Sequence, residues 1–407
     1  MTARDLPSSS LQSAISAAAL KRIGRARKRV VFLVHSPETF SALEPVIEEM
    51  QRRPEAFDLV FFALPRSYSG LSTSKFSGME STFVFLDQKG LKPIGLAGRS
   101  MADLETLVRL APDYIFRQAP WDQDVPSVFD TTQLGFAHLC YVPYGLAMVE
   151  TPEYQYNQRF HNACDFIFCE SEFEYAAYAN HRVMGTQGVR MTGYPRFERF
   201  IAELAASDAN AWPVATPAGT PRVIWAPHHS LAKEWLCFST FMEHKDAMLR
   251  EAERGRISLL LRPHPALRER LGALGLMTPA QYDAYVQAFA SAGCSGVDTE
   301  REYIRSFAAS DALITDGLGF FSEYMLTGKP LIRTRRSDSV ALNSFAQWLV
   351  EACHNVDDAW QLRDVLEALA TGHYVDELAA QRGERQQHLT ALGQGASQRI
   401  VDTLQTW

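Results

Sequence analysis

The sequence has no Cys-x-x-Cys pair, no excess of basic residues, and no apolar run near the roughly 18 to 20 residues that span a bilayer. Its six cysteines are scattered, so we expect reduced thiols in a cytoplasmic protein, with neither a disulfide framework nor a structural zinc site. With 40 Lys and Arg against 47 Asp and Glu, the formal net charge of −7 argues against a nucleic-acid partner. Short repeats and low-complexity tracts are missing too, which argues against a fibrous or disordered protein.

Apolar segments of strand length alternate with segments of helix length along most of the 407 residues. This alternation predicts an α/β fold with mainly parallel sheets covered on both faces, and the chain is long enough for two domains. A helix is predicted at 39–53, and strands are predicted at 29–34, 59–64, 82–86, 114–116, 137–142, 166–169, 223–226, 257–261, 312–315 and 331–333.

A segment rich in Ala and Pro at 205–221 separates two similar halves and is predicted to be a linker. We therefore expect a basic N-terminal segment at 1–28, a first Rossmann-like domain at 29–204 and a second at 222–350. The tail at 351–407 has a helical pattern and is expected to pack across the domains.

The N-terminal segment concentrates positive charge, because no acidic residue lies between Asp5 and Glu38. Six basic residues follow an Ala-rich stretch that is compatible with a helix: Lys21, Arg22, Arg25, Arg27, Lys28 and Arg29. Such a segment either lies on an anionic membrane surface or forms a solvated helix ahead of the first strand. It is not a secretory signal, since the basic residues follow the apolar stretch.

Polar residues directly follow several predicted strands, where open parallel sheets bind their ligands. The clearest case is the run from Arg262 to Pro265, in which two prolines stiffen the loop and leave the side chains to bind. Arg262 suits bidentate contact with a phosphate, and His264 can donate to a phosphate oxygen or protonate a leaving group. The alternative is a loop whose Arg and His only face solvent.

A second candidate runs from the strand at 312–315 through a glycine turn into a short helix. Gly317 and Gly319 allow the backbone to approach a ligand closely, and the N–H groups at the start of the helix suit a diphosphate. Glu323, one turn into that helix, can accept hydrogen bonds from ribose hydroxyls. An ordinary turn between strand and helix is the alternative.

Histidines follow the first strand of each half. His228 and His229 can act as general bases or phosphate ligands, and Ser230 can cap the next helix. Because adjacent histidines on a loop are expected to point apart, with no carboxylate near in sequence, we expect no zinc there. In the first half, His35 is either a base that activates an acceptor or a histidine held by local backbone groups.

Together these motifs resemble the CDP-glycerol glycerophosphotransferase family of teichoic-acid and capsule enzymes. The resemblance rests on 223–227, 262–265, 311–330 and the run from Thr192 to Glu198, and it covers about 140 to 335. It implies the GT-B fold, in which two Rossmann-like parallel-sheet domains face a central cleft, with the first on the acceptor side and the second holding the nucleotide donor. The donor-binding residues that it implies, taken with the residues above, are Arg262, His264, His229, Ser230, Thr315, Asp316, Gly317, Leu318, Gly319, Phe320 and Glu323.

Two motifs of that family differ in this sequence. The family's paired serines are Leu318 and Gly319 here, so contacts to phosphate must come from backbone N–H groups. Its His-Gly-Thr motif, whose histidine is a candidate base, is replaced by Tyr144-Gly145-Leu146. The base is therefore Tyr144, His35 or His228, or the reaction has changed.

We expect a transferase that moves glycerol phosphate, or a related polyol phosphate, from a CDP-activated donor onto a cell-surface glycan or lipid-linked precursor. It needs a base, donors for the phosphate charge and stabilisation of the leaving nucleotide, but neither a cofactor nor a metal. Peripheral contact with the inner face of the plasma membrane is part of this prediction. The alternatives are a nucleotide-sugar-dependent glycosyltransferase or epimerase on the same fold, and a non-catalytic GT-B module.

Overall fold

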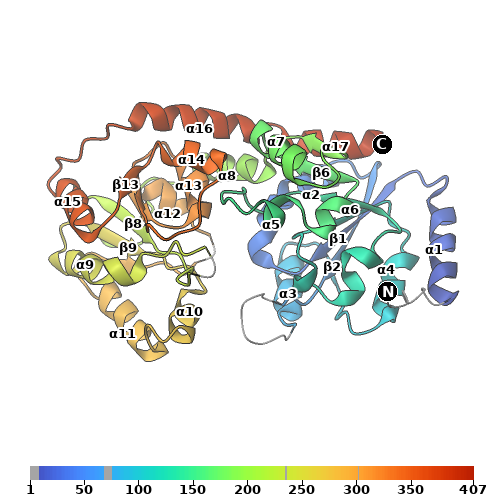
Figure 1. Cartoon of the computed structure of the whole chain (residues 1–407), viewed down its shortest axis with the longest axis horizontal. Helices are drawn as coiled ribbons and strands as arrows, with labels where there is room; N and C mark the ends of the chain where they lie inside the picture. The colour runs from blue at the N-terminus through green and yellow to red at the C-terminus, as the bar shows by residue number, and fades with distance from the viewer. Residues whose placement is uncertain (1–8, 68–75, 234–235, 301) are drawn as a thin grey trace. The chain divides into compact units, whose positions relative to one another are not determined.

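The structure is a computed structural model that describes residues 9–67, 76–233, 236–300 and 302–407. It has two compact units, each built on one parallel sheet flanked by helices (Figure 1). Unit 1 consists of the described residues of 1–146, 151–198 and 392–407, and unit 2 of those of 147–150 and 199–391. The predicted fold class, with two parallel α/β domains, is confirmed.

Unit 1 contains a seven-stranded sheet in the order β3-β2-β1-β4-β5-β6-β7, with every neighbouring pair parallel. Its strands are β1 (Lys28–Val34), β2 (Phe57–Ala63), β3 (Ile94–Gly95), β4 (Tyr114–Arg117), β5 (His138–Tyr141), β6 (Phe166–Cys169) and β7 (Val189–Met191). Its helices are α1 (Ser9–Arg22), α2 (Glu44–Gln51), α3 (Met79–Gln88), α4 (Met101–Arg109), α5 (Pro152–Tyr156), α6 (Arg159–Ala163), α7 (Glu172–His181) and α17 (Ala396–Thr406), with 3-10 turns at Pro37–Ala42, Asp122–Asp124, Ser127–Phe129 and Thr131–Gln133.

Stacked phenylalanines fill the centre of unit 1. Phe32 of β1 stacks on Phe61 of β2 and Phe116 of β4, with ring centroids 5.2 and 5.1 Å apart. Because each fully buried Phe contributes about 2 kcal/mol, this row holds the three central strands together.

Unit 2 contains a six-stranded parallel sheet in the order β10-β9-β8-β11-β12-β13. Its strands are β8 (Arg222–Ala226), β9 (Ser258–Leu261), β10 (Gly296–Val297), β11 (Ala312–Thr315), β12 (Leu331–Thr334) and β13 (His354–Val356). Its helices are α9 (Phe241–Arg254), α10 (Leu267–Ala273), α11 (Pro279–Ala290), α12 (Ile304–Ala309), α13 (Leu318–Met325), α14 (Ser344–Val350) and α15 (Ala359–Ala370), while α8 (Pro195–Ala206) and α16 (Ala379–Gly393) contain residues of both units. The buried Trp225 of β8 stacks on Phe241 of α9 at 5.6 Å in the core.

One predicted strand is wrong. Residues 82–86 lie in α3, where Thr82 and Leu86 are buried and Phe83 and Val84 are exposed. A spacing of four between the buried positions is helical, so packing of one face overrides the strand propensity of the β-branched and aromatic residues. The other predicted strands occur within two residues of their expected ends.

Four strands are absent from the prediction: β3, β7, β10 and β13. Each is two or three residues long and lies at an edge of its sheet. Segments this short carry almost no periodicity, so only the pairing partner defines them as strands.

The segment predicted as a linker packs against unit 2. Trp212 is 8% exposed, and its indole N–H donates to Ser258 Oγ at 2.8 Å. The long continuous stretch of unit 2 begins at Arg199 inside α8, ahead of the expected linker. In the C-terminal tail, α15 belongs to unit 2 and α17 to unit 1.

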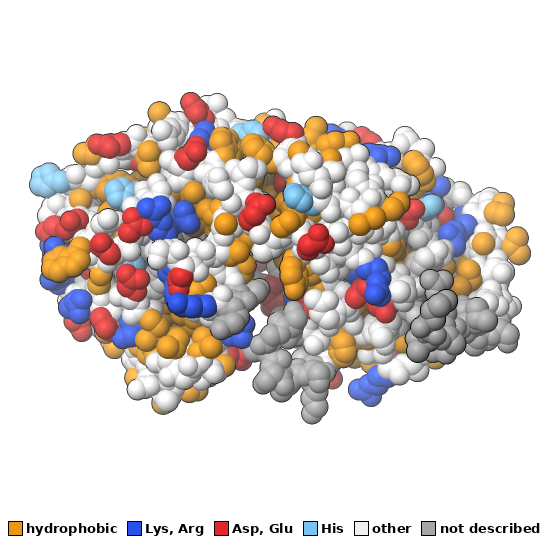
Figure 2. All heavy atoms as spheres, viewed as in Figure 1, with side chains coloured by type: hydrophobic (Ala, Val, Ile, Leu, Met, Phe, Trp, Pro, Cys, Tyr) orange, Lys and Arg blue, Asp and Glu red, His pale blue; other side chains and the backbone are white. Residues whose placement is uncertain are grey.

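All six cysteines are free thiols, and five of them are buried. In the part of the chain that the structure describes, no helix is both long and apolar enough to cross a membrane. On the face drawn in Figure 2, acidic and basic side chains are interspersed, so that face carries no broad patch of one sign.

Candidate functional site

The carboxyl edge of the unit 2 sheet brings three predicted motifs together. The strand order reverses between β8 and β11, with β9 and β10 on one side and β12 and β13 on the other. Ligands of open parallel sheets bind at such a reversal. The motifs at 228–230, 262–265 and 316–319 lie in the loops after β8, β9 and β11, so this edge is the candidate site.

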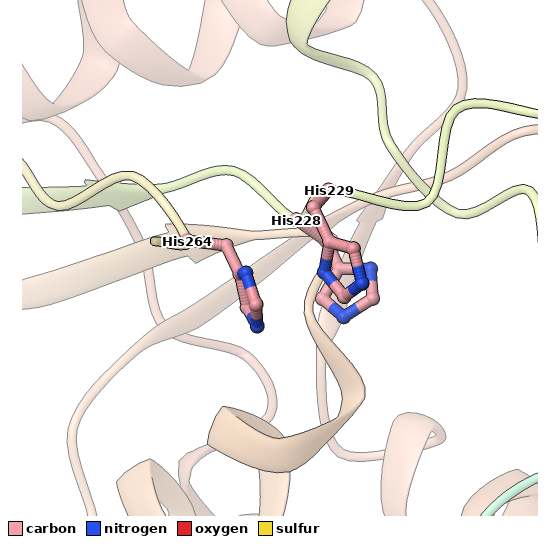
Figure 3. A group of neighbouring side chains, drawn as sticks. All are labelled: His228, His229 and His264. Carbon is pink, nitrogen blue, oxygen red and sulfur yellow. The ribbon is translucent and has the colours of Figure 1, made fainter. Parts of the chain in front are cut away.

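Three imidazole rings cluster at this edge, on the same side of their loops (Figure 3). The centroid of the His229 ring lies 3.9 Å from that of His264 and 4.3 Å from that of His228. The centroids of His228 and His264 are 5.2 Å apart. The expectation that His228 and His229 point apart is therefore wrong, since the loop turns both rings toward His264.

Backbone hydrogen bonds hold the loops after β8 and β9 together. Arg262 N donates to Trp225 O at 2.8 Å, and His264 N donates to Pro227 O at 3.1 Å. The prolines on both sides of His264 restrict the loop further. The position of the His264 ring thus follows from the sequence of this loop and its pairing with the neighbouring one.

Backbone N–H groups also hold two of the rings. Ala266 N donates to His264 Nδ1 at 3.1 Å. Ser230 N donates to His228 Nδ1 at 3.2 Å, and Ser230 Oγ lies 2.8 Å from the same nitrogen. Ser230 therefore contacts His228, where the sequence suggested a helix cap or a donor contact.

Burial makes the imidazoles neutral. It lowers the pKa of His264 to about 4 and, together with the nearby His264 and Arg270, the pKa of His229 to about 3. Burial and the two neighbouring rings also hold the pKa of His228 well below its usual range. At neutral pH the cluster is uncharged and each ring has one N–H donor.

Asp316 connects the loops of the site through its carboxylate. One carboxylate oxygen accepts from His228 N at 2.5 Å, and the other accepts from Thr240 N at 2.6 Å and Thr240 Oγ1 at 2.9 Å. Burial raises the pKa of Asp316 to about 6 despite these hydrogen bonds. Both oxygens are used within the protein, so Asp316 positions the loops.

The helix α13 begins beside His228. An added Cβ on Gly317 would lie 3.7 Å from His228 Cδ2 and 3.3 Å from Thr315 Oγ1, whereas one on Gly319 would meet nothing within 4 Å. Gly317 N donates to Thr315 Oγ1 at 2.9 Å. The start of α13, with Leu318 and Gly319 in its first turn, has no side-chain cap and directs the positive end of the helix dipole toward this edge. Phe320 follows in that turn, and its ring packs at a tilt against Tyr303 with the centroids 5.0 Å apart.

Arg262 is bound by protein groups. Its guanidinium lies 2.7 Å from Asp298 Oδ2, donates to Glu300 O at 2.6 Å, and stacks on Tyr303 at 4.8 Å. The Tyr303 hydroxyl donates to Glu323, which is 6% exposed. Arg262 and Glu323 therefore support the loops around the rings, and their predicted contact with the donor stays a prediction.

In unit 1 the corresponding reversal lies between β1 and β4. His35 N and Ser36 N donate to Gln118 Oε1 at 2.7 and 3.0 Å, and Gln118 Nε2 donates to Ser36 O at 2.8 Å. The His35 ring is buried, and no described residue forms a hydrogen bond with either ring nitrogen. Burial and the charges of Arg66 and Arg117 hold its pKa well below the usual range.

Tyr144 follows β5 in the same unit. Burial raises the pKa of its phenol, while a hydrogen bond from Trp121 and the charge of Arg66 act in the opposite direction. Arg66 forms an ion pair with the buried Asp124 at 2.9 Å. Arg66 influences both His35 and Tyr144, so the two first-domain candidates share one environment.

The sequence reasoning missed several residues that shape these sites: Gln118, Thr240, Asp298 and Tyr303. Gln118 was detectable, because it follows the predicted strand at 114–116 almost directly. Asp298 follows β10, which is too short to predict. Nothing in the sequence around Thr240 connects it with Asp316, which lies 76 residues away.

Comparison with known proteins gives one family and many similar folds. Residues 134–335 match the family model described as CDP-Glycerol:Poly(glycerophosphate) glycerophosphotransferase. None of the curated proteins searched matches the chain.

Among solved structures, the wall teichoic acid polymerase TagF is similar at a TM-score of 0.57, with 11% identity over 98% of this chain and 94% of that one. A TagF variant soaked with CDPG is similar at 0.54, with 12% identity over 98% and 94%. The UDP-GlcNAc 2-epimerase from Neisseria meningitidis bound to UDP-GlcNAc is similar at 0.61, with 14% identity over 93% and 100%. At these identities the structures show a shared two-domain fold and no more.

Proposed function

We propose, from the match of residues 134–335 to the CDP-glycerol:poly(glycerophosphate) glycerophosphotransferase family model, that the chain transfers glycerol phosphate, or a related polyol phosphate, from a CDP-activated donor to an acceptor hydroxyl. The observation that carries the proposal is that the matched segment contains all three loops of the unit 2 site. The proposed acceptor is a cell-surface glycan or lipid-linked precursor of the teichoic-acid or capsule type.

The proposed reaction joins the acceptor oxygen to the β-phosphorus of the donor and breaks the bond from that phosphorus to the oxygen bridging to CMP. A base takes the hydroxyl proton, and CMP leaves with the electrons of the broken bond. Negative charge develops on the phosphate and on the leaving group. The His264 ring and the N–H groups at the start of α13 supply donors for that charge without a metal or cofactor.

Hydrogen bonding supports one of the three candidates for the base. A neutral His228 ring whose Nδ1 accepts from Ser230 N carries its proton on Nε2, so it is a donor. Tyr144 has a raised pKa, which makes its phenolate scarce at neutral pH. Neither ring nitrogen of His35 has a hydrogen-bond partner among the described residues, so the lone pair of one of them is available, and we assign the base role to His35.

The proposal includes peripheral contact with an anionic membrane. Four of the six basic residues are already engaged in unit 1: Arg22 donates to Phe136 O, Arg25 to Ala111 O, Arg27 to Pro54 O and Arg29 to Asp58. This argues against the whole segment acting as a basic membrane helix, and it limits the contact to the end of α1.

At that end two aliphatic side chains are exposed, Leu20 at 70% and Ile23 at 78%, beside the exposed Lys21 and the half-exposed Arg27. We expect sedimentation with phosphatidylglycerol vesicles to fall in the L20S/I23S double variant. The matched V183S variant, which removes another exposed aliphatic side chain of unit 1, should sediment like the parent. Equal sedimentation of all three proteins would refute the membrane contact.

The function is tested by calorimetric titration with CDP-glycerol, CDP-ribitol, CMP, UDP and UDP-GlcNAc, followed by product analysis in the presence and absence of EDTA. Cytidine-specific binding, with acceptor-dependent release of CMP that survives EDTA, is the expected result. Preference for UDP-GlcNAc would place the chain with nucleotide-sugar enzymes, such as the UDP-GlcNAc 2-epimerase of similar fold. Failure to bind any nucleotide would leave a non-catalytic module.

A further inference from the structure

A cavity of about 400 Å³ lies at one edge of the unit 1 sheet. It is lined by the end of α2, by the first half of β2 and by residues 90–92, which precede β3. Since β2 begins at Phe57, this half lies beside the amino end of β1, whereas His35 follows the carboxyl end of β1. The cavity is therefore separate from the strand-end loops to which the transfer reaction is assigned, and its volume suits a small ligand or the end of a peptide.

The first half of β2 is an open strand edge. On one side β2 pairs with β1 along its whole length, but on the other side it pairs with β3 only at Phe62 and Ala63. Gly90 and Lys92 have left-handed backbones, with φ of 74° and 47°, so the segment before Ile94 cannot extend β3 along β2. An edge of this kind leaves backbone N–H and C=O groups available to another chain.

Two hydrogen bonds show which backbone groups of β2 face that edge. Lys28 N of β1 donates to Ala56 O, directly before β2, at 2.7 Å, so the even-numbered residues face β1. Leu96 N donates to Ala63 O at 3.0 Å, so the odd-numbered residues face outward. The backbone groups of successive strand residues alternate between the two sides. The outward-facing residues of the open half are thus Phe57, Leu59 and Phe61.

Four backbone groups on this edge make no hydrogen bond with any described residue: Phe57 O, Leu59 N, Leu59 O and Phe61 N. The two other outward groups are used. Phe57 N donates to Arg53 O at 3.1 Å, and the register of β3 directs Ile94 N to Phe61 O. Two donors and two acceptors in one row are what an extended backbone pairs with, whereas an acyl chain offers no matching groups.

A chain that adds parallel to β2 uses all four groups with two of its residues. The first donates to Phe57 O and accepts from Leu59 N, and the second, two positions later, donates to Leu59 O and accepts from Phe61 N. The next position of that row is held by Ile94, which pairs with Phe62. The added chain has to end before Ile94, so its carboxyl terminus lies beside the start of β3.

Lys92 supplies the charge at that end. It lies two positions before Ile94 and is the one charged residue among the described residues that line the cavity. It is exposed and forms no ion pair with a described residue. A carboxyl terminus brings a charge of opposite sign to this end, whereas the amino terminus of an antiparallel chain would bring a like charge. The rest of the lining is apolar apart from Gln51, which favours apolar side chains in the bound chain.

We propose that this cavity binds the carboxyl-terminal end of an extended, apolar polypeptide, which adds to β2 as a short parallel strand and pairs its terminal carboxylate with Lys92. The partner is therefore a second protein that presents its free C-terminus. The cavity lies outside the proposed transferase site, so this inference does not depend on the proposed function.

The probe is the peptide acetyl-Leu-Val-Leu with a free carboxylate, compared by calorimetry with the same peptide ended by an amide. We expect the amide to bind at least about tenfold more weakly than the acid, because it lacks the charge that faces Lys92. K92M should weaken binding of the acid by a similar factor and leave binding of the amide unchanged. K89M removes a charge from the same loop, at a residue that pairs with Glu44, and should bind the acid like the parent. An amide that binds as tightly as the acid would overturn the proposal.

Methylation of the peptide nitrogens tests strand addition. Only alternate residues of the added chain face β2, so a methyl group on the nitrogen of the last Leu removes the donor to Leu59 O, whereas one on the Val nitrogen points away from β2. We expect binding at least about tenfold weaker for the first peptide and within about threefold of the unmodified peptide for the second. Equal effects of the two methyl groups would contradict a parallel strand.

The L59P variant makes the matching change in the protein. It removes an outward N–H that β1 does not use, and proline is tolerated at such edge positions. The variant should lose peptide binding, while its urea unfolding stays cooperative and its affinity for CDP-glycerol stays unchanged. Full peptide binding by L59P would show that the edge of β2 is not the site.

Sodium decanoate provides the opposing outcome. Binding of decanoate as tight as that of the acid peptide, lost in K92M and kept in L59P, would show a site for fatty anions and overturn the proposal, as would the absence of binding by every peptide. Peptide binding by a protein that does not bind CDP-glycerol would leave this site standing and contradict the proposed function. CDP-glycerol binding without peptide binding would do the reverse.

Discussion

The carboxylate of Asp316 accepts a hydrogen bond from the backbone N–H of His228 at 2.5 Å, which ties the loop after β11 to the loop after β8. In unit 1, the carboxamide of Gln118 makes the equivalent connection with the backbone N–H of His35 at 2.7 Å, between the loops after β4 and β1. Both connections lie where the strand order of a sheet reverses. In each unit, one buried polar side chain thus links the two loops that flank the reversal of strand order.

Replacing Asp316 by Ala should reduce both stability and nucleotide binding. The change leaves His228 N and Thr240 N without their acceptor, and each such buried group costs about 1–3 kcal/mol. Asp311 provides the control, because its carboxylate accepts from Arg222 N at 2.8 Å at the opposite end of β11. Urea unfolding and calorimetry should show that D311A loses stability and retains binding. Normal binding by D316A would show that the loop tie is unnecessary.

The stability of the protein should fall between about pH 6.5 and pH 4 because of the buried histidines. The pKa of His264 is about 4 in the folded protein and near 6.5 in the unfolded chain, so the unfolded chain takes up the proton first as the pH falls. Asp316, with its pKa raised to about 6, has the opposite effect over about pH 6 to 4. The loss on acidification should be smaller in H264Q than in the parent by urea unfolding at a series of pH values. An unchanged slope would mean that the His264 ring ionises normally.

The base assignment predicts different outcomes for two residues of unit 1. H35A should lower turnover about 100-fold or more without changing the affinity for CDP-glycerol, since the base acts on the acceptor hydroxyl. Y144F, which removes only the phenolic oxygen, should stay within about threefold of the parent. Steady-state rates measure the turnover of both variants, and calorimetry measures their affinity for the donor. Full activity of H35A together with inactive Y144F would transfer the base role to Tyr144.

Lys329 should contribute to stability and not to chemistry. Its ammonium group donates to the carbonyls of Phe307, Ala308 and Ser310, with the first at 3.2 Å, and so satisfies the end of α12. K329M should lower the free energy of unfolding by about 2 kcal/mol and leave donor affinity unchanged. K245M, at an exposed ion pair with Asp246, should change neither. A loss of donor affinity in K329M at full stability would contradict this role.

The strand-end rule predicts most of the candidate site from the amino-acid sequence. The runs 228–230, 262–265 and 316–319 are candidates because each follows an apolar strand, and all three lie at one sheet edge. What each side chain does there is harder to predict. Arg262 suits a phosphate by its chemistry, yet Asp298 and Tyr303 hold it in place. Asp298 follows a two-residue strand that carries no readable pattern.

The sequence by itself determined the two parallel α/β halves, because continuous apolar strands and helical spacing record burial on both faces of a sheet. It also determined that the polar residues lie at the strand ends, because a predicted strand also gives the residues that directly follow it. Only the tertiary structure decided that three imidazoles meet, that two of them face backbone N–H groups, and that Asp316 is used within the protein. The meeting of the rings and the contacts of Asp316 join residues about 35 to 90 positions apart, and no local pattern encodes distances of that kind.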